Sequence, residues 1–136
     1  MTATLTRDLE RLTHSGLELA DPAADLRGRD VRDNTGDDVG SVADLLVDPG
    51  LREVRMLEID TGGGLLGIGR RRLLVPLEAV MGTDARTVFI NAEREAIVNG
   101  PGYQPAEGDE EEAQYLAAYE TYGLTPYWDT PTPVRR

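Results

Sequence analysis

Residues 29–50 read RDVRDNTGDDVGSVADLLVDPG, in which two β-like runs enclose a cluster of turn residues. Asn34 and Gly36 lie between the runs and can take the positive φ angles that a tight hairpin connection requires. The second run stops at Pro49-Gly50, a pair that favours a type II turn. Because strands and tight turns alternate without intervening helices, the stretch predicts a β-sandwich or β-barrel rather than repeated βαβ units.

Three further β-like runs extend the pattern over residues 52–60, 73–77 and 87–91. In the first of them both faces are partly apolar, because Leu57 and Ile59 alternate with Met56 and Glu58. This pattern fits a strand with one face in a barrel and the other beneath a helix or a second subunit, and a β-bulge is the alternative explanation. Pro76 places the next run at a sheet edge or a strand end, since proline cannot donate to a β-ladder.

Short helices are expected on both sides of these strands. Thr6 can cap a helix that contains Leu5, Leu9 and Leu12 and stops near Ser15-Gly16. Asn91 can cap a second helix over residues 92–99, which Gly100 and Pro101 would end. A third helix should begin near Asp109, because three glutamates follow where the helix macrodipole favours negative charge, and Gly123 should end it.

Three regions follow from this pattern. We expect a helical N-terminal extension over residues 1–25, a β-barrel over residues 26–104, and an acidic, aromatic helical extension over residues 105–136. The last extension carries Tyr115, Tyr119 and Tyr122 at helical spacing, with Tyr127 and Trp128 after the helix. Such a stripe would fold back over the barrel, or it would anchor a partner or a second subunit.

The composition argues against several classes of function. The 136 residues carry a net charge of −11, which opposes binding to nucleic acid or to anionic lipid and makes basic partners or cations easier to accommodate. Cysteine is absent, which removes disulfides, thiolate metal sites and thiol nucleophiles. No apolar run approaches the roughly 20 residues of a membrane-spanning helix. We therefore expect a cytoplasmic protein that neither inserts stably into membranes nor binds nucleic acid.

Several clusters resemble functional sites but have simpler interpretations. The segment GGGLLG at 62–67 matches G-x-G-x-x-G, yet a β-like run follows it where a dinucleotide site needs a helix, so a hairpin loop is expected. The arginines at 70–72 should pair within the chain or with an acidic partner. The acids Asp37, Asp38, Asp44 and Asp48 lack the spacing of an EF-hand, which favours solvated turn acids over a cation site.

Catalysis has little support in the sequence. His14 is the single histidine, Ser15 and Ser41 are the only serines, and neither serine lies in a nucleophile motif. We predict that the chain is not an enzyme and has no catalytic, cofactor-binding or metal-binding residues.

Several segments, in order, resemble a known family. They are Leu26–Val31, Gly36, Val39–Asp48, Val54–Ile59 and the "VP" strand Leu73–Leu77. Together, over Leu26 to Asn91, they resemble the PRC-barrel domain. That family occurs in the cytoplasmic part of the photosynthetic reaction centre H subunit, in a ribosome maturation factor that binds a small-subunit protein, and in stand-alone bacterial proteins. The resemblance implies a mainly β fold, a small barrel of about five to six strands with short flanking helices, and a docking or assembly role without catalysis.

The prediction is therefore a non-catalytic adaptor that binds a protein partner or a second copy of itself, with a homodimer as the expected form. Met56, Glu58, Tyr119 and Trp128 are the predicted partner or dimer surface. A small-ligand or cation sensor is the first alternative. An accessory role in photosynthetic electron transfer like that of the H subunit is the second alternative, although the H subunit has a membrane helix and this sequence shows none.

Overall fold

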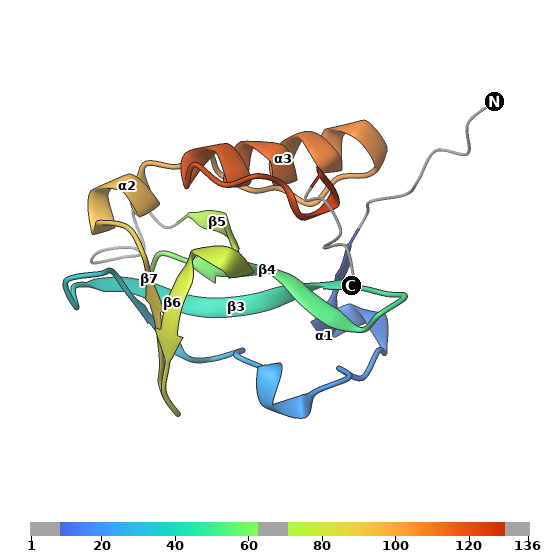
Figure 1. The fold of residues 1–136 in the computed structure, drawn as a ribbon, viewed down its shortest axis with the longest axis horizontal. Helices are drawn as coiled ribbons and strands as arrows, with labels where there is room; N and C mark the ends of the chain where they lie inside the picture. The colour runs from blue at the N-terminus through green and yellow to red at the C-terminus, as the bar shows by residue number, and fades with distance from the viewer. Residues whose placement is uncertain (1–8, 63–70, 130–136) are drawn as a thin grey trace, which may run out of the picture.

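The computed structural model describes residues 9–62 and 71–129, which form a mainly β fold with short helices (Figure 1). The strands are β1 (Glu10–Arg11), β2 (Asp30–Arg32), β3 (Asp38–Asp48), β4 (Glu53–Asp60), β5 (Arg72–Pro76), β6 (Val80–Thr83) and β7 (Thr87–Ile90). The α-helices are α1 (Leu12–Ser15), α2 (Arg94–Val98) and α3 (Gly108–Thr121), and the 3-10 turns are η1 (Pro22–Ala24), η3 (Leu77–Ala79) and η4 (Tyr127–Asp129). The predicted fold class is confirmed.

The strands form one curled sheet in the order β5-β4-β3-β2-β7-β6, with β1 added to β3. All pairs are antiparallel except β2 with β7, which are parallel. The sheet is a half-barrel, with β5 and β6 as its two edges. Pro76 ends the edge strand β5, as predicted. Two strands were not predicted: β1 has only two residues, and β6 includes Gly82 and lacks apolar alternation.

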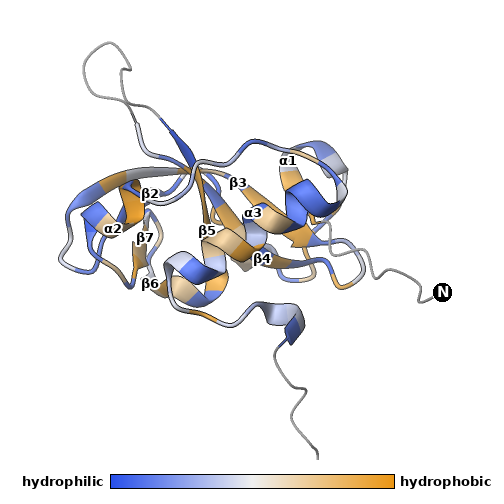
Figure 2. Ribbon diagram, turned by 90° about the horizontal axis from the view of Figure 1, so that it is seen from above, coloured by the Kyte–Doolittle hydropathy of each residue, from blue (hydrophilic) through white to orange (hydrophobic). Residues whose placement is uncertain are grey.

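The sheet separates two apolar clusters. The inner cluster lies within the curl, between the strands, the segment before β2 and helix α2. Its members include Leu12, Leu26, Val31, Val42, Leu45, Leu57, Ile59, Val75, Val88, Ile90 and Ile97. The outer cluster lies between the sheet and α3 and consists of Leu9, Leu46, Met56, Leu74, Tyr103, Tyr115, Ala118 and Tyr119. Seen from above, α3 lies over strands that carry mostly hydrophobic residues (Figure 2).

Strand β4 has two apolar faces for both of the reasons predicted: one face lies in the barrel and the other beneath a helix, and the strand also contains a bulge. Leu57 and Ile59 belong to the inner cluster, whereas Met56 belongs to the outer cluster beneath α3. The pairing with β3 then shifts, because Met56 opposes Leu46 while Val54 opposes Val47, which leaves Arg55 as the extra residue of a bulge. The bulge returns Val54 to the inner cluster.

The first hairpin forms between β2 and β3 as predicted, and Asp33 organises its turn. The Asp33 carboxylate accepts hydrogen bonds from the Thr35 hydroxyl (2.7 Å) and from the backbone N–H groups of Thr35 and Asp37 (both 2.8 Å). Its other oxygen accepts from the Arg94 N–H (2.8 Å), the first residue of α2. Burial opposes ionisation of Asp33, but these hydrogen bonds prevail and lower its pKa to about 2. The predicted cap of α2 by Asn91 is therefore wrong, since Asp33 supplies it from the hairpin.

Two further local predictions are wrong. Gly50 does not have the positive φ of a type II turn; instead Arg52 has a φ of 56°, and its N–H donates to the Asp48 carbonyl in a longer turn. Among the described residues 9–16, Leu9 precedes a strand and the α-helix is confined to Leu12–Ser15, because residues 10 and 11 pair with Val47 and Leu46 of β3. Backbone pairing with β3 stabilises residues 10 and 11 more than a helix with leucines at helical spacing would. Leu5 and Thr6 lie outside the described residues.

The C-terminal helix agrees with its prediction. It begins at Gly108 with three acids in its first turn, and Gly123, with a φ of 67°, follows its end. α3 packs on the sheet of its own chain (Figure 1).

Candidate functional site

The predicted partner surface lies mostly inside the molecule. Met56 and Tyr119 are 0% exposed and Glu58 is 1% exposed, because α3 and the segments around it cover this part of the sheet. Trp128 is half-buried, with its ring edge against Tyr119 at 5.9 Å between centroids. The expectation that Met56, Glu58 and Tyr119 form an accessible surface therefore needs correction. The structure brings three of the four residues, Met56, Tyr119 and Trp128, together as an intrachain contact.

The buried carboxylate of Glu58 is the centre of an ion-pair network with two partly exposed arginines. Arg11 Nε lies 2.9 Å from one carboxylate oxygen of Glu58, and Arg72 Nη1 lies 2.6 Å from the other. Asp60 is 3.5 Å from Arg72, and Asp44 is 3.6 Å from Arg11. A buried carboxylate requires such partners, because leaving its charge unpaired in the interior would be strongly destabilising. The network ties β1, which pairs with β3, and the edge strand β5 to the central strand β4.

A second polar cluster fastens α3. The Tyr103 hydroxyl donates to Glu111 in the first turn of α3 (2.6 Å), and the Ala106 N–H donates to the other oxygen of Glu111 (2.8 Å). Burial and the neighbouring Glu111 carboxylate raise the pKa of Tyr103, which keeps this donor protonated. The Tyr115 hydroxyl accepts from the Leu9 N–H at 3.0 Å. These bonds explain why the aromatic helix stays on its own sheet.

The ion-pair network continues to the opposite side of the sheet. Asp44 accepts hydrogen bonds from the backbone N–H groups of Thr13 (3.1 Å) and Leu45 (2.8 Å). The Thr13 hydroxyl in turn accepts from Arg27 Nη1 at 3.2 Å. Contacts therefore run without a break from Glu58 through Arg11, Asp44 and Thr13 to Arg27, and they hold α1 and the segment before β2 in place.

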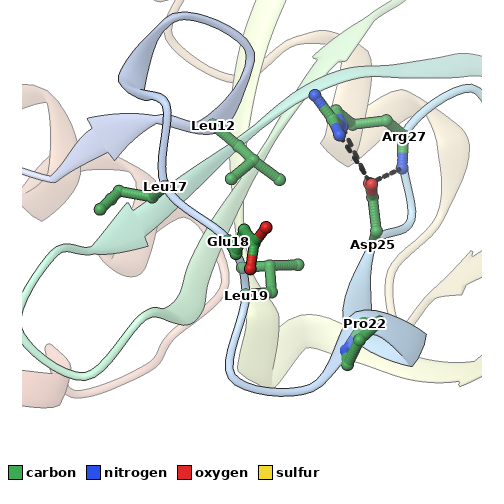
Figure 3. Close-up of a pocket in the computed structure, with 7 residues that line it drawn as sticks. All are labelled: Leu12, Leu17, Glu18, Leu19, Pro22, Asp25 and Arg27. Carbon is green, nitrogen blue, oxygen red and sulfur yellow. Dashed lines mark hydrogen bonds and ion pairs between the residues drawn. The ribbon is translucent and has the colours of Figure 1, made fainter.

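Between α1 and this segment lies a half-open cleft of about 420 Å³, which we call the N-terminal cleft (Figure 3). It is lined by Leu12, Leu17, Glu18, Leu19, Pro22, Asp25 and Arg27. Leu12 is buried in the inner cluster, and Leu17 and Leu19 pack against that cluster. The cleft thus combines an apolar floor, continuous with the core, with charged groups at its mouth.

The charged groups of the cleft differ in their partners. Asp25 pairs with Arg27 Nη2 at 2.7 Å and accepts from Arg27 Nε at 2.9 Å. The Arg27 hydrogen bond holds the pKa of Asp25 below its ordinary value. Glu18 is exposed, and its carboxylate has no hydrogen bond or ion pair to any of the described residues. Figure 3 shows Glu18 between Leu17 and the Asp25–Arg27 pair.

The remaining sequence candidates do not gather into a site. Most of the glycine segment and Arg70 lie outside the described residues. Arg71 donates to the carbonyls of Val98 and Gly100 at the end of α2, and Arg72 pairs with Glu58, so these two arginines pair within the chain. Within 9–62 and 71–129, no three acids or histidines come close enough to hold a metal ion. The Ser15 hydroxyl donates to the Leu12 carbonyl and accepts from the Leu17 N–H, as part of a local turn.

The N-terminal cleft was not predicted from the sequence. Its one signal was the pattern Leu17-Glu18-Leu19, in which two apolar residues flank an acid outside any helix or strand. This pattern is not a recognised motif. The cleft forms because the hydrogen bonds of Thr13 to Asp44 and Arg27 hold the chain in place, and the sequence carries no local signal for those contacts.

Comparison with known proteins identifies the fold. A family model described as the PRC-barrel domain matches residues 20–97, which confirms the resemblance drawn from Leu26 to Asn91. No curated protein matches the chain. In the part of the chain that the structure describes, no helix is both long and apolar enough to cross a membrane. The matched range includes Pro22, Asp25 and Arg27 of the cleft, whereas α3 lies outside it.

Proposed function

This chain belongs to the PRC-barrel domain family, and from that membership and its N-terminal cleft we propose that it is a non-catalytic docking module for another protein. The family is in general non-catalytic. Fold alone does not fix a function, so the proposal depends on the surface that this chain offers.

Docking by strand addition is poorly supported. The edge strand β6 has four residues and a pairing irregularity between Val80 and Gly82, and short or bulged edges resist pairing with another chain. At the other edge, Leu73 of β5 already forms a bridge with Gly102, and the Tyr103 N–H donates to the Arg72 carbonyl. Side-chain recognition in a cleft is therefore the better supported mode.

The observation that carries the proposal is the construction of the N-terminal cleft. It is half-open, its apolar floor is part of the core, and a chain of polar contacts holds its walls. A preformed cavity of this kind loses little conformational entropy on binding, because its groups are already ordered. Because α3 covers the outer cluster, that cluster is not open to a partner, and we assign the partner to the N-terminal cleft.

Site-specific crosslinking tests this proposal. A photo-crosslinking amino acid would replace Ala23, an exposed residue next to Pro22 of the cleft, and, in a separate variant, Glu120, an exposed glutamate on α3. We expect position 23 to form a protein adduct in the native cell at ordinary expression and position 120 to form none. Equal labelling from both positions, or none from position 23, would count against the docking function. An adduct with a second copy of the chain would support the predicted homodimer.

A small-ligand sensor is the second candidate, because a volume of about 420 Å³ is also within the range of small-molecule sites. A thermal-shift screen with metal ions, nucleotides and quinones separates the two functions. Stabilisation of the chain by one of them, together with no adduct at position 23, would favour the sensor. The cytoplasmic location and the role resembling the H subunit stay predictions.

A further inference from the structure

The walls of the N-terminal cleft suit the stem of a long, unbranched side chain. Leu12, Leu17, Leu19 and Pro22 are its apolar residues, and they line one continuous space. Lysine and arginine bury three or four methylene groups against apolar surface while their charged heads stay near water. A half-open cleft with an apolar floor and a polar mouth fits this division.

The charged groups of the cleft favour a cation over an anion. The Arg27 guanidinium already bonds to Asp25 and to the Thr13 hydroxyl, so an incoming anion would have to compete with both. Glu18 is the acceptor at the mouth without a partner among the described residues. The two acids and one arginine leave a net charge of −1 on the lining.

The charge of the whole chain acts in the same direction. A net charge of −11 attracts basic segments from a distance and raises their local concentration before contact. The same field repels acidic segments and phosphate groups, and the occupant is therefore selected by charge as well as by shape.

We propose that the N-terminal cleft receives one arginine or lysine side chain from a basic segment of the partner protein, with its stem between Leu17, Leu19 and Pro22 and its head on Glu18. The inference rests on the docking function proposed above and specifies the chemistry of the partner.

A titration followed by NMR tests the occupant. The probe is the peptide Gly-Arg-Gly with blocked ends, and the matched control replaces arginine by citrulline, which keeps the shape and removes the charge. The methyl groups of Leu12, Leu17 and Leu19 report on the cleft. We expect saturable shifts of these methyls with the arginine peptide and little change with the citrulline peptide. Equal shifts with both peptides, or shifts confined to other parts of the chain, would overturn the proposal.

Two charge variants distinguish attraction of the peptide by Glu18 from attraction by the net charge of the chain. Glu18→Gln and Glu120→Gln each remove one negative charge from an exposed glutamate, and neither side chain packs in an apolar cluster. We expect Glu18→Gln to weaken binding of the arginine peptide about fivefold, the effect of losing one solvent-exposed ion pair, and Glu120→Gln to leave it nearly unchanged. Equal losses in both variants would reduce the effect to net charge and refute the proposal.

The two proposals fail in different ways. If position 23 forms no adduct in the cell, the docking function fails whatever the peptides do. If it forms an adduct but the crosslinked partner segment contains no arginine or lysine, docking stands and the basic occupant is refuted. If free methylguanidine binds as tightly as the peptide, the cleft is a small-ligand site, and the sensor function is favoured over docking.

Discussion

At Gly40, the backbone of β3 passes directly against the carbonyl group of Asp60 and the Cα of Thr61. A Cβ atom built at Gly40 would overlap that carbonyl, and the atoms it would meet belong to backbone that cannot move aside like a flexible side chain. The close approach lies where β3 begins to pair with the end of β4. One missing side chain thus permits the first pairing of the long central hairpin.

Gly40→Ala should lower the free energy of unfolding by about 1–3 kcal/mol, the usual cost of overpacking. Urea denaturation measures it. Gly82→Ala in β6 is the matched control, because its Cβ would meet nothing within 4 Å and its φ is not positive, so a change within about 0.5 kcal/mol is expected. A tolerated Gly40→Ala would show that β3 and β4 separate more easily than the structure indicates.

Asp33 makes a pH-dependent contribution to stability. Its pKa is about 2 in the folded chain against an ordinary value of 3.8, so its contribution is present above pH 3.8 and is lost as the pH falls toward 2. We expect Asp33→Asn to lower the melting temperature near pH 6, with the gap to the unaltered chain closing between pH 4 and pH 2. Calorimetry at a series of pH values measures the gap. A gap that does not change with pH would mean that the negative charge of Asp33 is unimportant.

At the scale of elements, helix α3 completes the fold. Tyr115 and Tyr119 fill the outer cluster over Leu46, Met56 and Leu74. Removal of the helix would expose this cluster on the sheet, so a chain cut after Gly108 is expected to aggregate. Such a truncation therefore cannot separate partner binding from folding, and point substitutions in the cleft are needed for that purpose.

Tyr119→Ala is expected to reduce the free energy of unfolding by about 3–5 kcal/mol, because it leaves an aromatic-sized cavity under α3. Leu116→Ala lies on the same helix at an exposed position and should cost less than about 1 kcal/mol. Chemical denaturation of both variants makes the comparison. Similar losses in the two variants would contradict the packing of α3 on its own sheet.

The sequence predicted the elements whose signals are local. Turn residues connect the strands of the first hairpin, acids and Gly123 mark the ends of α3, and Pro76 marks the end of the edge strand. It failed where tertiary contacts decide: β1 forms because it can pair with β3, and α2 is capped by Asp33 from a distant hairpin. The turn after β3 was also predicted wrongly, because it closes between Asp48 and Arg52 and gives the positive φ to Arg52 rather than to Gly50. Glu58 was singled out, but its pairing with arginines 11 and 72, 47 and 14 residues away, has no local signal.

At the scale of the whole molecule, excess negative charge opposes compactness. Twenty-five acids face fourteen arginines, and at low ionic strength the unpaired acids repel one another. The Glu58 carboxylate is buried, so salt screens its pairs with the partly exposed Arg11 and Arg72 less than it screens repulsion among fully exposed charges.

The melting temperature at pH 7 should therefore rise when sodium chloride is increased from about 10 mM to about 150 mM, which shortens the screening length from roughly 30 Å to roughly 8 Å. Differential scanning fluorimetry measures the change, and an uncharged osmolyte at equal osmolality is the control. A fall in melting temperature would show that exposed ion pairs such as Asp25 with Arg27 outweigh the repulsion.

The hydrogen bond from the Leu9 N–H to the Tyr115 hydroxyl joins positions 106 residues apart. A chain leaves the ribosome with its N-terminal end first, and so the Leu9 N–H lacks this hydrogen-bond acceptor until α3 has been synthesised. The half-barrel can curl in the meantime, but its outer face remains uncovered. For this protein, the interval between the synthesis of β5 and that of α3 is the period in which a chaperone would find a sheet to bind.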